Sequence, residues 1–195
     1  MKNIKMNHNK LILIVFCIFL PLFLLLFSYK VVLGLSDLTE NQQETIDFLN
    51  NKQELNLNYT TNEVSHLEDV KGVMNLIDYL FYFRLIIITL IITYYRKNKD
   101  QLKKLFKCGG ITTLISIGLI LLFVLISFNT TFTIFHQIFF PQGNWLFPID
   151  SLLIQTFPIG FFIGISVKIF LLTMGLGSIF IGVSYYLKYV RSKRN

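Results

Sequence analysis

Two histidines lie in segments that hold few other groups able to move a proton. His66 begins "HLEDVKGVM", and His136 lies in "FHQIFFPQGNWLFPID", residues 135–150, among five aromatic rings. Because an imidazole titrates near neutral pH, such a ring can take up a proton as a base or return one as an acid. The third histidine, His8, lies in a basic tail and is expected to be solvated. The pair His66 and His136 therefore predicts acid–base chemistry.

The usual enzyme nucleophiles are not in evidence. No G-x-S-x-G elbow occurs, Cys17 lies in an apolar run and Cys108 in a basic stretch, so the two cysteines are not expected to meet or to act in redox chemistry. The sequence therefore offers no recognisable activated serine or cysteine for covalent catalysis.

The segment around His136 combines rings with amide side chains. Trp145 and Phe147 resemble an interfacial aromatic belt, but Gln142 and Asn144 lie between the rings. This combination indicates an amphipathic pocket. Asp150 precedes "SLLIQTF", which predicts that it is the N-cap of a short helix.

These residues must be positioned by membrane helices, because 53% of the 195 residues are hydrophobic and only 15% are charged. A helix needs about twenty apolar residues to cross a bilayer core. Four stretches qualify or nearly so, at residues 11–35, 76–95, 111–128 and 169–187. The predicted fold is an all-α membrane protein with four transmembrane helices in a single membrane domain.

The charges orient these helices. Thirteen of the eighteen Lys and Arg residues lie in "MKNIKMNHNK", "RKNKDQLKKLFK" and "KYVRSKRN". Positive segments stay in the cytoplasm, so both termini and the middle loop are expected there. Residues 36–75 and 129–168 then form an extracytoplasmic cap made of two loops. The net charge of +7 reports topology in a cell membrane, and no nucleic-acid partner is expected.

The first loop has its own local signals. Thr39 is placed to be the N-cap of a short helix, and residues 55–59 alternate like a short strand that could pair with residues 131–135. Ser65 and Glu68 have the spacing of a capping box, which predicts that His66 is the first residue of the second long helix. The partial positive charge of a helix N-terminus would favour the neutral imidazole.

A single arginine falls inside a predicted span. Arg84 lies twelve residues before Arg96, which is about 18 Å along a helix, at a depth where charge is costly. It is expected to snorkel or to pair inward, and contact with a lipid ester or headgroup beneath the cap is the functional alternative.

The two histidine segments, extended to "FHQIFFPQGNWLFPIDSLLIQTFP", resemble those of the lipoprotein intramolecular transacylases, integral membrane enzymes of Gram-positive bacteria. The resemblance covers nearly the whole chain. It implies that the sn-2 acyl chain of a diacylglyceryl lipoprotein moves to the amino group of its own N-terminal cysteine. It implies that His66 and His136 are the catalytic residues, and we assign substrate binding or support to Asp69, Lys71, Arg84, Phe139, Phe140, Gln142, Asn144, Trp145 and Asp150.

Two other classes of function remain open at this point. A metal-dependent membrane hydrolase could use both histidines with Asp69 or Asp150, although no H-E-x-x-H spacing occurs. A receptor or transport subunit would use the four spans without chemistry. The transacylase interpretation expects no metal and no cofactor, a monomer, and two partners, the lipoprotein substrate and membrane lipid.

Overall fold

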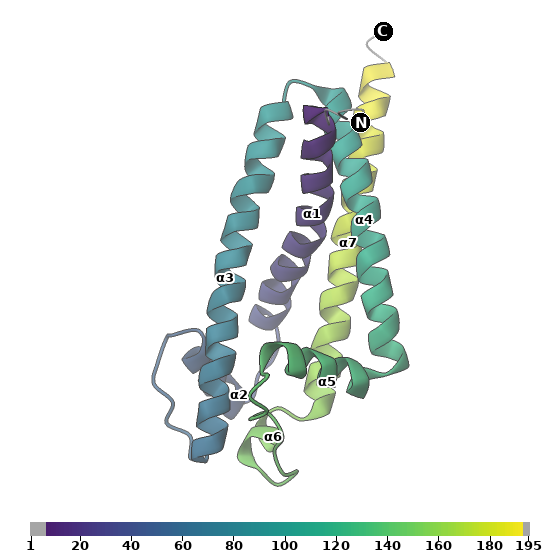
Figure 1. The fold of residues 1–195 in the computed structure, drawn as a ribbon. Coiled ribbons are helices and arrows are strands. Elements are labelled where there is room, and N and C mark those ends of the chain that lie inside the picture. Colours follow the sequence, from purple (N-terminus) through teal and green to yellow (C-terminus); the bar gives the residue numbers. More distant parts are fainter. Residues whose placement is uncertain (1–6, 193–195) are drawn as a thin grey trace, which may run out of the picture. The chain divides into compact units, whose positions relative to one another are not determined.

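The computed structural model describes residues 7–192, and within that range the chain forms seven α-helices and no strand (Figure 1). The helices are α1 (His8–Gly34), α2 (Glu40–Leu49), α3 (Thr61–Tyr95), α4 (Lys99–Ile126), α5 (Phe128–Phe139), α6 (Leu152–Thr156) and α7 (Ile159–Ser192). By length and composition, α1, α3, α4 and α7 could each cross a membrane. Their apolar side chains are exposed, for example Leu90 at 60% and Ile179 at 59%, as expected of surfaces that face lipid.

The chain divides into two compact units. Unit 1 comprises the chain up to Lys30, Phe81–Leu121 and the chain from Ile169 onward, whereas unit 2 comprises Val31–Leu80 and Leu122–Lys168. Unit 2 therefore contains the residues of both predicted histidine segments, and its internal contacts define the candidate site.

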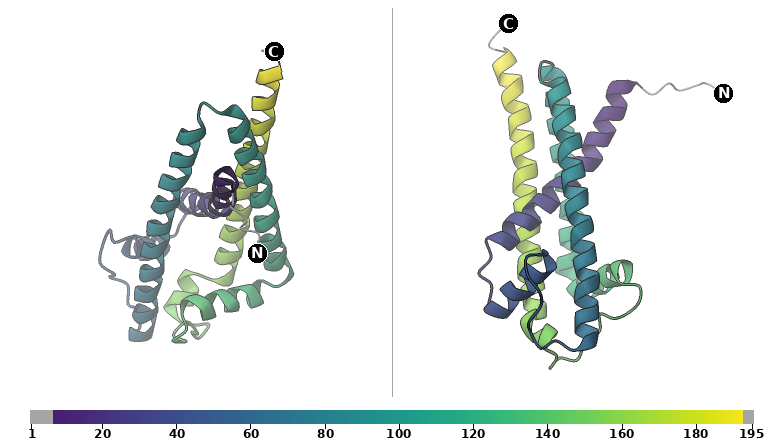
Figure 2. Two further views of the ribbon diagram at one scale, coloured as in Figure 1. Left: turned by 45° about the horizontal axis from the view of Figure 1, so that its top comes forward. Right: turned by 90° about the vertical axis from the view of Figure 1, so that its left-hand side faces the viewer.

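The helix ends that carry basic residues gather at one end of unit 1. In Figure 1 and in the right-hand view of Figure 2, the start of α1, the turn at residues 96–98 and the end of α7 all lie there. Tyr95 donates a hydrogen bond from its hydroxyl to Asn9 Oδ1 at 2.6 Å, and its neighbour Tyr94 packs edge-on against the exposed ring of His8. Residues 1–6 and 193–195, which hold part of the two basic ends, lie outside the described residues.

A proline in the middle of α1 is compensated by a neighbouring helix. Pro21 has no N–H, so it cannot bond the carbonyl oxygen of Cys17, four residues earlier. The hydroxyl of Thr112 on α4 lies 3.1 Å from that carbonyl oxygen and 3.0 Å from the Gly109 carbonyl oxygen of its own helix, so its hydrogen is shared between the two. A backbone oxygen that the proline would leave unpaired in an apolar surrounding is thereby satisfied.

Cys17 and Cys108 lie side by side within hydrogen-bonding reach, and both are free thiols. The prediction that they would not meet is therefore wrong. The reason is that α4 begins at Lys99, so the basic stretch is already helical and carries Cys108 into the helix bundle.

Glycines bring α4 and α7 into close contact. A Cβ added at Gly110 would lie 2.6 Å from the carbonyl oxygen of Gly177, and one added at Gly177 would lie 2.9 Å from the Thr113 side chain. Backbone approach of this kind is the usual basis of tight helix packing in membranes.

We expect Gly110→Ala to destabilise unit 1 by about 1–3 kcal/mol, because a backbone oxygen cannot move aside as a side chain can. Gly175→Ala on α7 is the matched control, since an added Cβ there meets nothing within 4 Å and alanine is the better helix former. Thermal unfolding in detergent measures both. Equal melting temperatures for the two variants would contradict the close approach.

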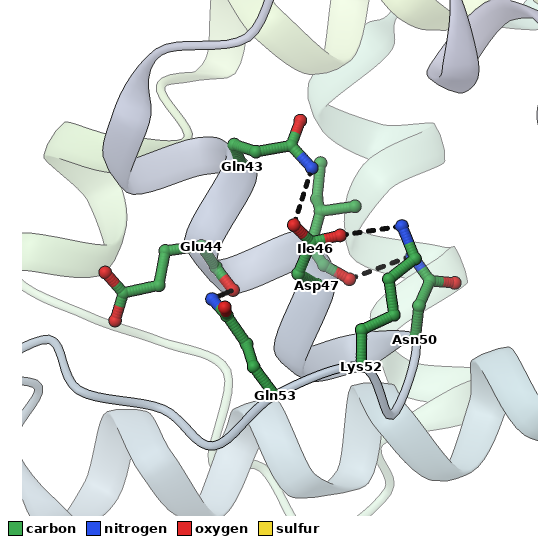
Figure 3. Close-up of polar contacts among 7 residues, drawn as sticks. All are labelled: Gln43, Glu44, Ile46, Asp47, Asn50, Lys52 and Gln53. Atoms are coloured by element: carbon green, nitrogen blue, oxygen red, sulfur yellow. Dashed lines mark hydrogen bonds and ion pairs between the residues drawn. The ribbon is translucent and has the colours of Figure 1, made fainter.

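In unit 2, α2 begins as predicted at the N-cap Thr39, which forms a capping box with Gln42. Side chains on the outer face of α2 form polar contacts with one another and with residues 50–53, which follow the helix (Figure 3). Asp47 accepts from Gln43 at 2.8 Å and pairs with Lys52 at 2.7 Å, and these contacts hold the pKa of the Asp47 carboxyl below its ordinary value. Further bonds of this face join Asn50 to the Ile46 carbonyl and Gln53 to the Glu44 carbonyl.

The inner face of α2 is tied to α6 by buried polar groups. Gln42 donates to the carbonyl oxygen of Thr156 at 2.7 Å. The hydroxyl of Tyr59 lies 2.9 Å from Thr45 Oγ1 and 3.3 Å from Thr156 Oγ1. Around these bonds packs an apolar core that includes Phe48 and Leu153. The segment that holds α2 and Tyr59 and the segment that holds α6, far apart in sequence, thus share one core.

The predicted strand pairing is wrong. Residues 55–59 are irregular, and residues 131–135 lie within α5. The apolar and polar residues of 128–139 fit a helix with one buried side, which leaves Ile134 and Ile138 exposed and turns His136 inward.

Candidate active site

The helix that carries His66 begins five residues before it. Thr60 and Glu63 form the capping arrangement, in which the Thr60 backbone N–H donates to Glu63 Oε2 at 2.7 Å and Thr60 Oγ1 accepts from the Glu63 N–H at 3.4 Å. The prediction that Ser65 caps this helix is therefore wrong, and His66 lies in its second turn. The neutral state of His66 cannot be attributed to a helix N-terminus.

Glu63 also connects this helix to the second cap segment. Its side chain is 1% exposed, and its Oε1 accepts from the backbone N–H of Leu153 at 2.8 Å, at the start of α6. Both oxygens of the carboxylate are thereby used, one on α3 and one on α6. The first two turns of α3 are fixed in place by this buried group.

His136 is the only residue of α5 that is buried. Its Nδ1 lies 2.8 Å from the carbonyl oxygen of Phe132, one turn earlier. Since a carbonyl oxygen can only accept, Nδ1 carries the hydrogen, and in the neutral ring Nε2 has a free lone pair. The helix itself therefore sets the tautomer of His136.

The structure brings the two predicted histidines together. Their rings are nearly parallel, with centroids 6.1 Å apart and an interplanar angle of 27°. Phe140, 2% exposed, contacts both, at 4.8 Å from His66 and 5.4 Å from His136. The ring centroid of Phe147 lies 5.6 Å from that of His66, and the ring centroid of Trp145 lies 5.0 Å from that of His136. The result is a histidine pair enclosed by aromatic rings.

This surrounding favours neutral rings. Burial lowers the pKa of His136 below its ordinary value, and the bond to Phe132 opposes that shift only in part. Burial of the His66 side chain, which is 6% exposed, likewise disfavours a charge there. Two neutral imidazoles can accept protons near pH 7.

Asp69 binds two amides from the segment after α5. Its Oδ2 accepts from Gln142 Nε2 and from Asn144 Nδ2, each at 2.6 Å. Asp69 lies one turn beyond His66 on α3, so these bonds hold the loop that carries Trp145 against the histidine face of that helix. Asp69, Gln142 and Asn144 are thus brought together next to the helix turn that carries His66.

Other predicted residues lie elsewhere. The Lys71 ammonium is 4.2 Å from the centre of the Phe48 ring on α2. Phe139 is 41% exposed and packs on Phe135. The N-cap of α6 is Ser151, whose hydroxyl accepts from the Ile154 N–H, so the prediction that Asp150 caps it is wrong. Ser151 has the extended backbone of an N-cap, so Asp150 lies outside the helix. The Asp150 side chain is exposed.

Arg84 belongs to unit 1. Its guanidinium lies over the ring of Phe19 on α1, 5.9 Å from the ring centre, so it pairs inward within the helix bundle.

Two residues of the site were not predicted. They are Phe132, which sets the tautomer of His136, and Glu63. Phe147, which was named among the rings of the expected pocket, contacts His66. A helical interpretation of residues 128–139 would have pointed to Phe132, because it precedes His136 by four residues. The Thr60–Glu63 spacing carried a signal for Glu63. Among the described residues, no group of three or more His, Cys, Asp and Glu side chains is arranged to hold a metal ion.

Together, four apolar helices long enough to cross a membrane and a buried histidine pair in unit 2 are the features of a multi-pass membrane enzyme. A sequence profile of the lipoprotein intramolecular transacylase Lit matches residues 11–162. The chain therefore belongs to this family of acyltransferases.

Solved structures agree in fold. The membrane-integral lipoprotein intramolecular transacylase Lit from Bacillus cereus superposes with a TM-score of 0.81 at 23% identity, covering 95% of this chain and 97% of that one. Two variants of the same protein, each with one histidine replaced, by arginine or by alanine, superpose with TM-scores of 0.78 and 0.76 at 21% and 23% identity. They cover 96% and 95% of this chain and 95% of the other chain in both cases. No curated protein matches the sequence significantly.

Proposed function

We propose that this enzyme transfers the sn-2 acyl chain of a diacylglyceryl lipoprotein to the α-amino group of the lipoprotein's own N-terminal cysteine. The observation that carries the proposal is the histidine pair, 6.1 Å apart and enclosed by rings, in a member of the transacylase family. Aromatic walls can fold the diacylglyceryl cysteine so that ester and amine meet, and that proximity supplies much of the rate. The products are an N-acyl, S-monoacylglyceryl lipoprotein with a free sn-2 hydroxyl.

The proton balance of this reaction calls for two acceptors. An N-terminal amine has a pKa near 8, so the substrate enters largely as an ammonium ion. The nitrogen loses one proton to become nucleophilic and a second when the amide forms. The N–C bond forms as the bond between the acyl carbon and the sn-2 oxygen breaks. One proton ends on the departing oxygen, and the other leaves to solvent.

His136 and His66 suit these two transfers. The Nε2 of His136 has a free lone pair, because Nδ1 donates to Phe132, so we assign His136 to take the second proton as the amide forms. His66 takes the first proton, which the ammonium group loses on becoming nucleophilic. As imidazolium, His66 returns this proton to the departing sn-2 oxygen. Neither step requires a metal, a nucleotide or an acyl-enzyme.

The test uses purified enzyme and a synthetic lipopeptide with a diacylglyceryl cysteine at its N-terminus. Mass spectrometry of the digested product should show unchanged total mass and an acyl chain moved from the glyceryl group to nitrogen. The same lipopeptide with an acetylated amine should not react. Transfer to a separate amine, or release of free fatty acid, would contradict intramolecular transfer.

We also propose that the two histidine loops are extracytoplasmic and that the termini and residues 96–107 are cytoplasmic, since basic segments gather at one end of unit 1. In a background with both native cysteines replaced by alanine, Glu54→Cys should react with an impermeant maleimide in intact cells. Lys99→Cys should react only after permeabilisation. Both positions are exposed, so the reverse pattern would overturn the topology.

Arg84 is proposed to support substrate placement, because a half-buried cation in an apolar span is costly without a role. Arg84→Gln is expected to lower the transfer rate and to cost about 0.5–2 kcal/mol of stability through loss of the contact with Phe19. Phe19→Leu removes the same contact and keeps the charge. If both variants lose the same activity, Arg84 acts only by stabilising the bundle.

A further inference from the structure

We propose that Asn144 is a positioning residue that fixes the tautomer of His66, with the hydrogen on Nδ1 and a free lone pair on Nε2. The inference rests on the proposed function for its catalytic meaning, but the tautomer itself is a property of the resting protein. The evidence is a pair of buried polar atoms and the direction of one hydrogen bond.

The two atoms are His66 Nδ1 and Asn144 Oδ1. Both are buried, and neither has a hydrogen-bond partner within the part of the chain that the structure describes. Asn144 is held beside His66, because its amide nitrogen bonds Asp69, one turn after His66, and lies 3.5 Å from the hydroxyl of Ser65, the residue before it. Buried polar atoms are rarely left unpaired, because each unpaired group costs about 1–3 kcal/mol. The proposal is that these two atoms pair with each other.

Asp69 decides which atom donates. A carboxylate only accepts, so the Asn144 atom that lies 2.6 Å from Asp69 Oδ2 must be the Nδ2 amide nitrogen. Nδ2 also lies 3.5 Å from Ser65 Oγ, on the same helix. The other end of the amide is then Oδ1, which can only accept. His66 must therefore donate from Nδ1.

The same logic applies to both histidines. The Phe132 carbonyl places the hydrogen of His136 on Nδ1, and the Asn144 carbonyl does so for His66. In the resting enzyme each ring then offers Nε2 as a proton acceptor. This matches a substrate that arrives as an ammonium ion and must lose two protons. The amide of Asn144 would also stabilise the imidazolium that His66 becomes.

The experiment is ¹⁵N NMR on enzyme labelled at its three histidines, in lipid or detergent near pH 7.5, with each signal assigned by single replacement. Pyrrole-type and pyridine-type nitrogens have distinct shifts. In the wild type, His66 should show pyrrole-type Nδ1 and pyridine-type Nε2. A wild-type His66 with the hydrogen on Nε2 overturns the proposal without any variant.

Variants then test the residue. Asn144→Ala should shift His66 toward the Nε2–H form and leave the His136 signals in place. Gln142→Ala is the matched control, since it removes a bond of equal length to the same Asp69 oxygen and should leave the tautomer unchanged. An unchanged His66 spectrum in Asn144→Ala overturns the proposal.

Activity adds the catalytic meaning. With the lipopeptide substrate, Asn144→Ala should lower kcat by about 10- to 100-fold, the usual effect of removing a group that orients a histidine ligand, with a smaller change in KM. If the tautomer shifts but the lipopeptide is never transferred by wild-type enzyme, the proposed function fails and the positioning role stands. If wild-type enzyme transfers the acyl chain normally but the His66 tautomer does not depend on Asn144, the positioning role fails and the proposed function stands.

Discussion

Replacement of either histidine by phenylalanine should lower lyso-form product by about 10²- to 10⁴-fold, the loss expected when a proton-transfer group is removed. Phenylalanine keeps a flat ring among Phe140, Phe147 and Trp145, so packing changes little while both ring nitrogens are lost. His66→Ala and His136→Ala should be equally inactive but less stable, because each leaves a cavity. Product is measured by mass spectrometry of the lipopeptide.

Matched replacements distinguish direct transfer from covalent catalysis. Cys17→Ala, Cys108→Ala, Ser65→Ala and Ser151→Ala should keep product formation. Loss of Ser151 removes the cap of α6 and should cost about 1 kcal/mol of stability rather than the chemistry. Wild-type turnover in either phenylalanine variant, or an acyl chain trapped on a serine or cysteine, would refute the two-histidine mechanism.

The second large effect is structural and arises at Glu63. Glu63→Ala leaves the backbone N–H groups of Thr60 and Leu153 without their acceptor, and each should cost about 1–3 kcal/mol. The start of α6 and the first turns of α3 should loosen together, and product should fall with them. Thermal unfolding in detergent and the lipopeptide assay measure the two consequences.

Glu68→Ala is the control for Glu63. Glu68 lies on the same helix and is exposed, so its removal should change stability by less than about 0.5 kcal/mol. Equal stability of the two variants would show that the buried carboxylate does not hold the cap segments together.

Features that depend on long runs of similar residues were predictable. Four apolar stretches were correctly interpreted as long helices, and Thr39 was correctly placed as a cap. Such features follow from local chemistry alone.

Features that depend on a partner far along the chain were not predictable. Thr60–Glu63 and Ser65–Glu68 have the same capping spacing, and the bond from Leu153 to Glu63, 90 residues apart, is a contact that the sequence does not reveal. Residues 131–135 alternate as a strand would, but a helix buries His136 against Trp145 and Phe140. In both cases tertiary contacts outweighed a plausible local pattern.

The candidate site was predicted in its residue types more than in its arrangement. His136 and the amides Gln142 and Asn144 were identified from the aromatic residues around them in sequence, and His66 from its place in the other large loop. The joint attachment of the two amides to Asp69 was not, because the relevant loop and helix are more than 70 residues apart. The nitrogen that carries the hydrogen in each ring depends on one nearby carbonyl group. The position of that carbonyl group follows only from the three-dimensional structure.

The proline in α1 has an evolutionary consequence. Because Pro21 frees the Cys17 carbonyl and Thr112 bonds it, the free-energy effects of substitutions at the two positions should be coupled. A lineage that replaces the proline regains the backbone N–H, and the threonine hydroxyl is then no longer needed for that oxygen. A lineage that loses the threonine first passes through an unpaired carbonyl in an apolar bundle. Substitution at residue 21 should therefore precede substitution at residue 112 in the history of this fold.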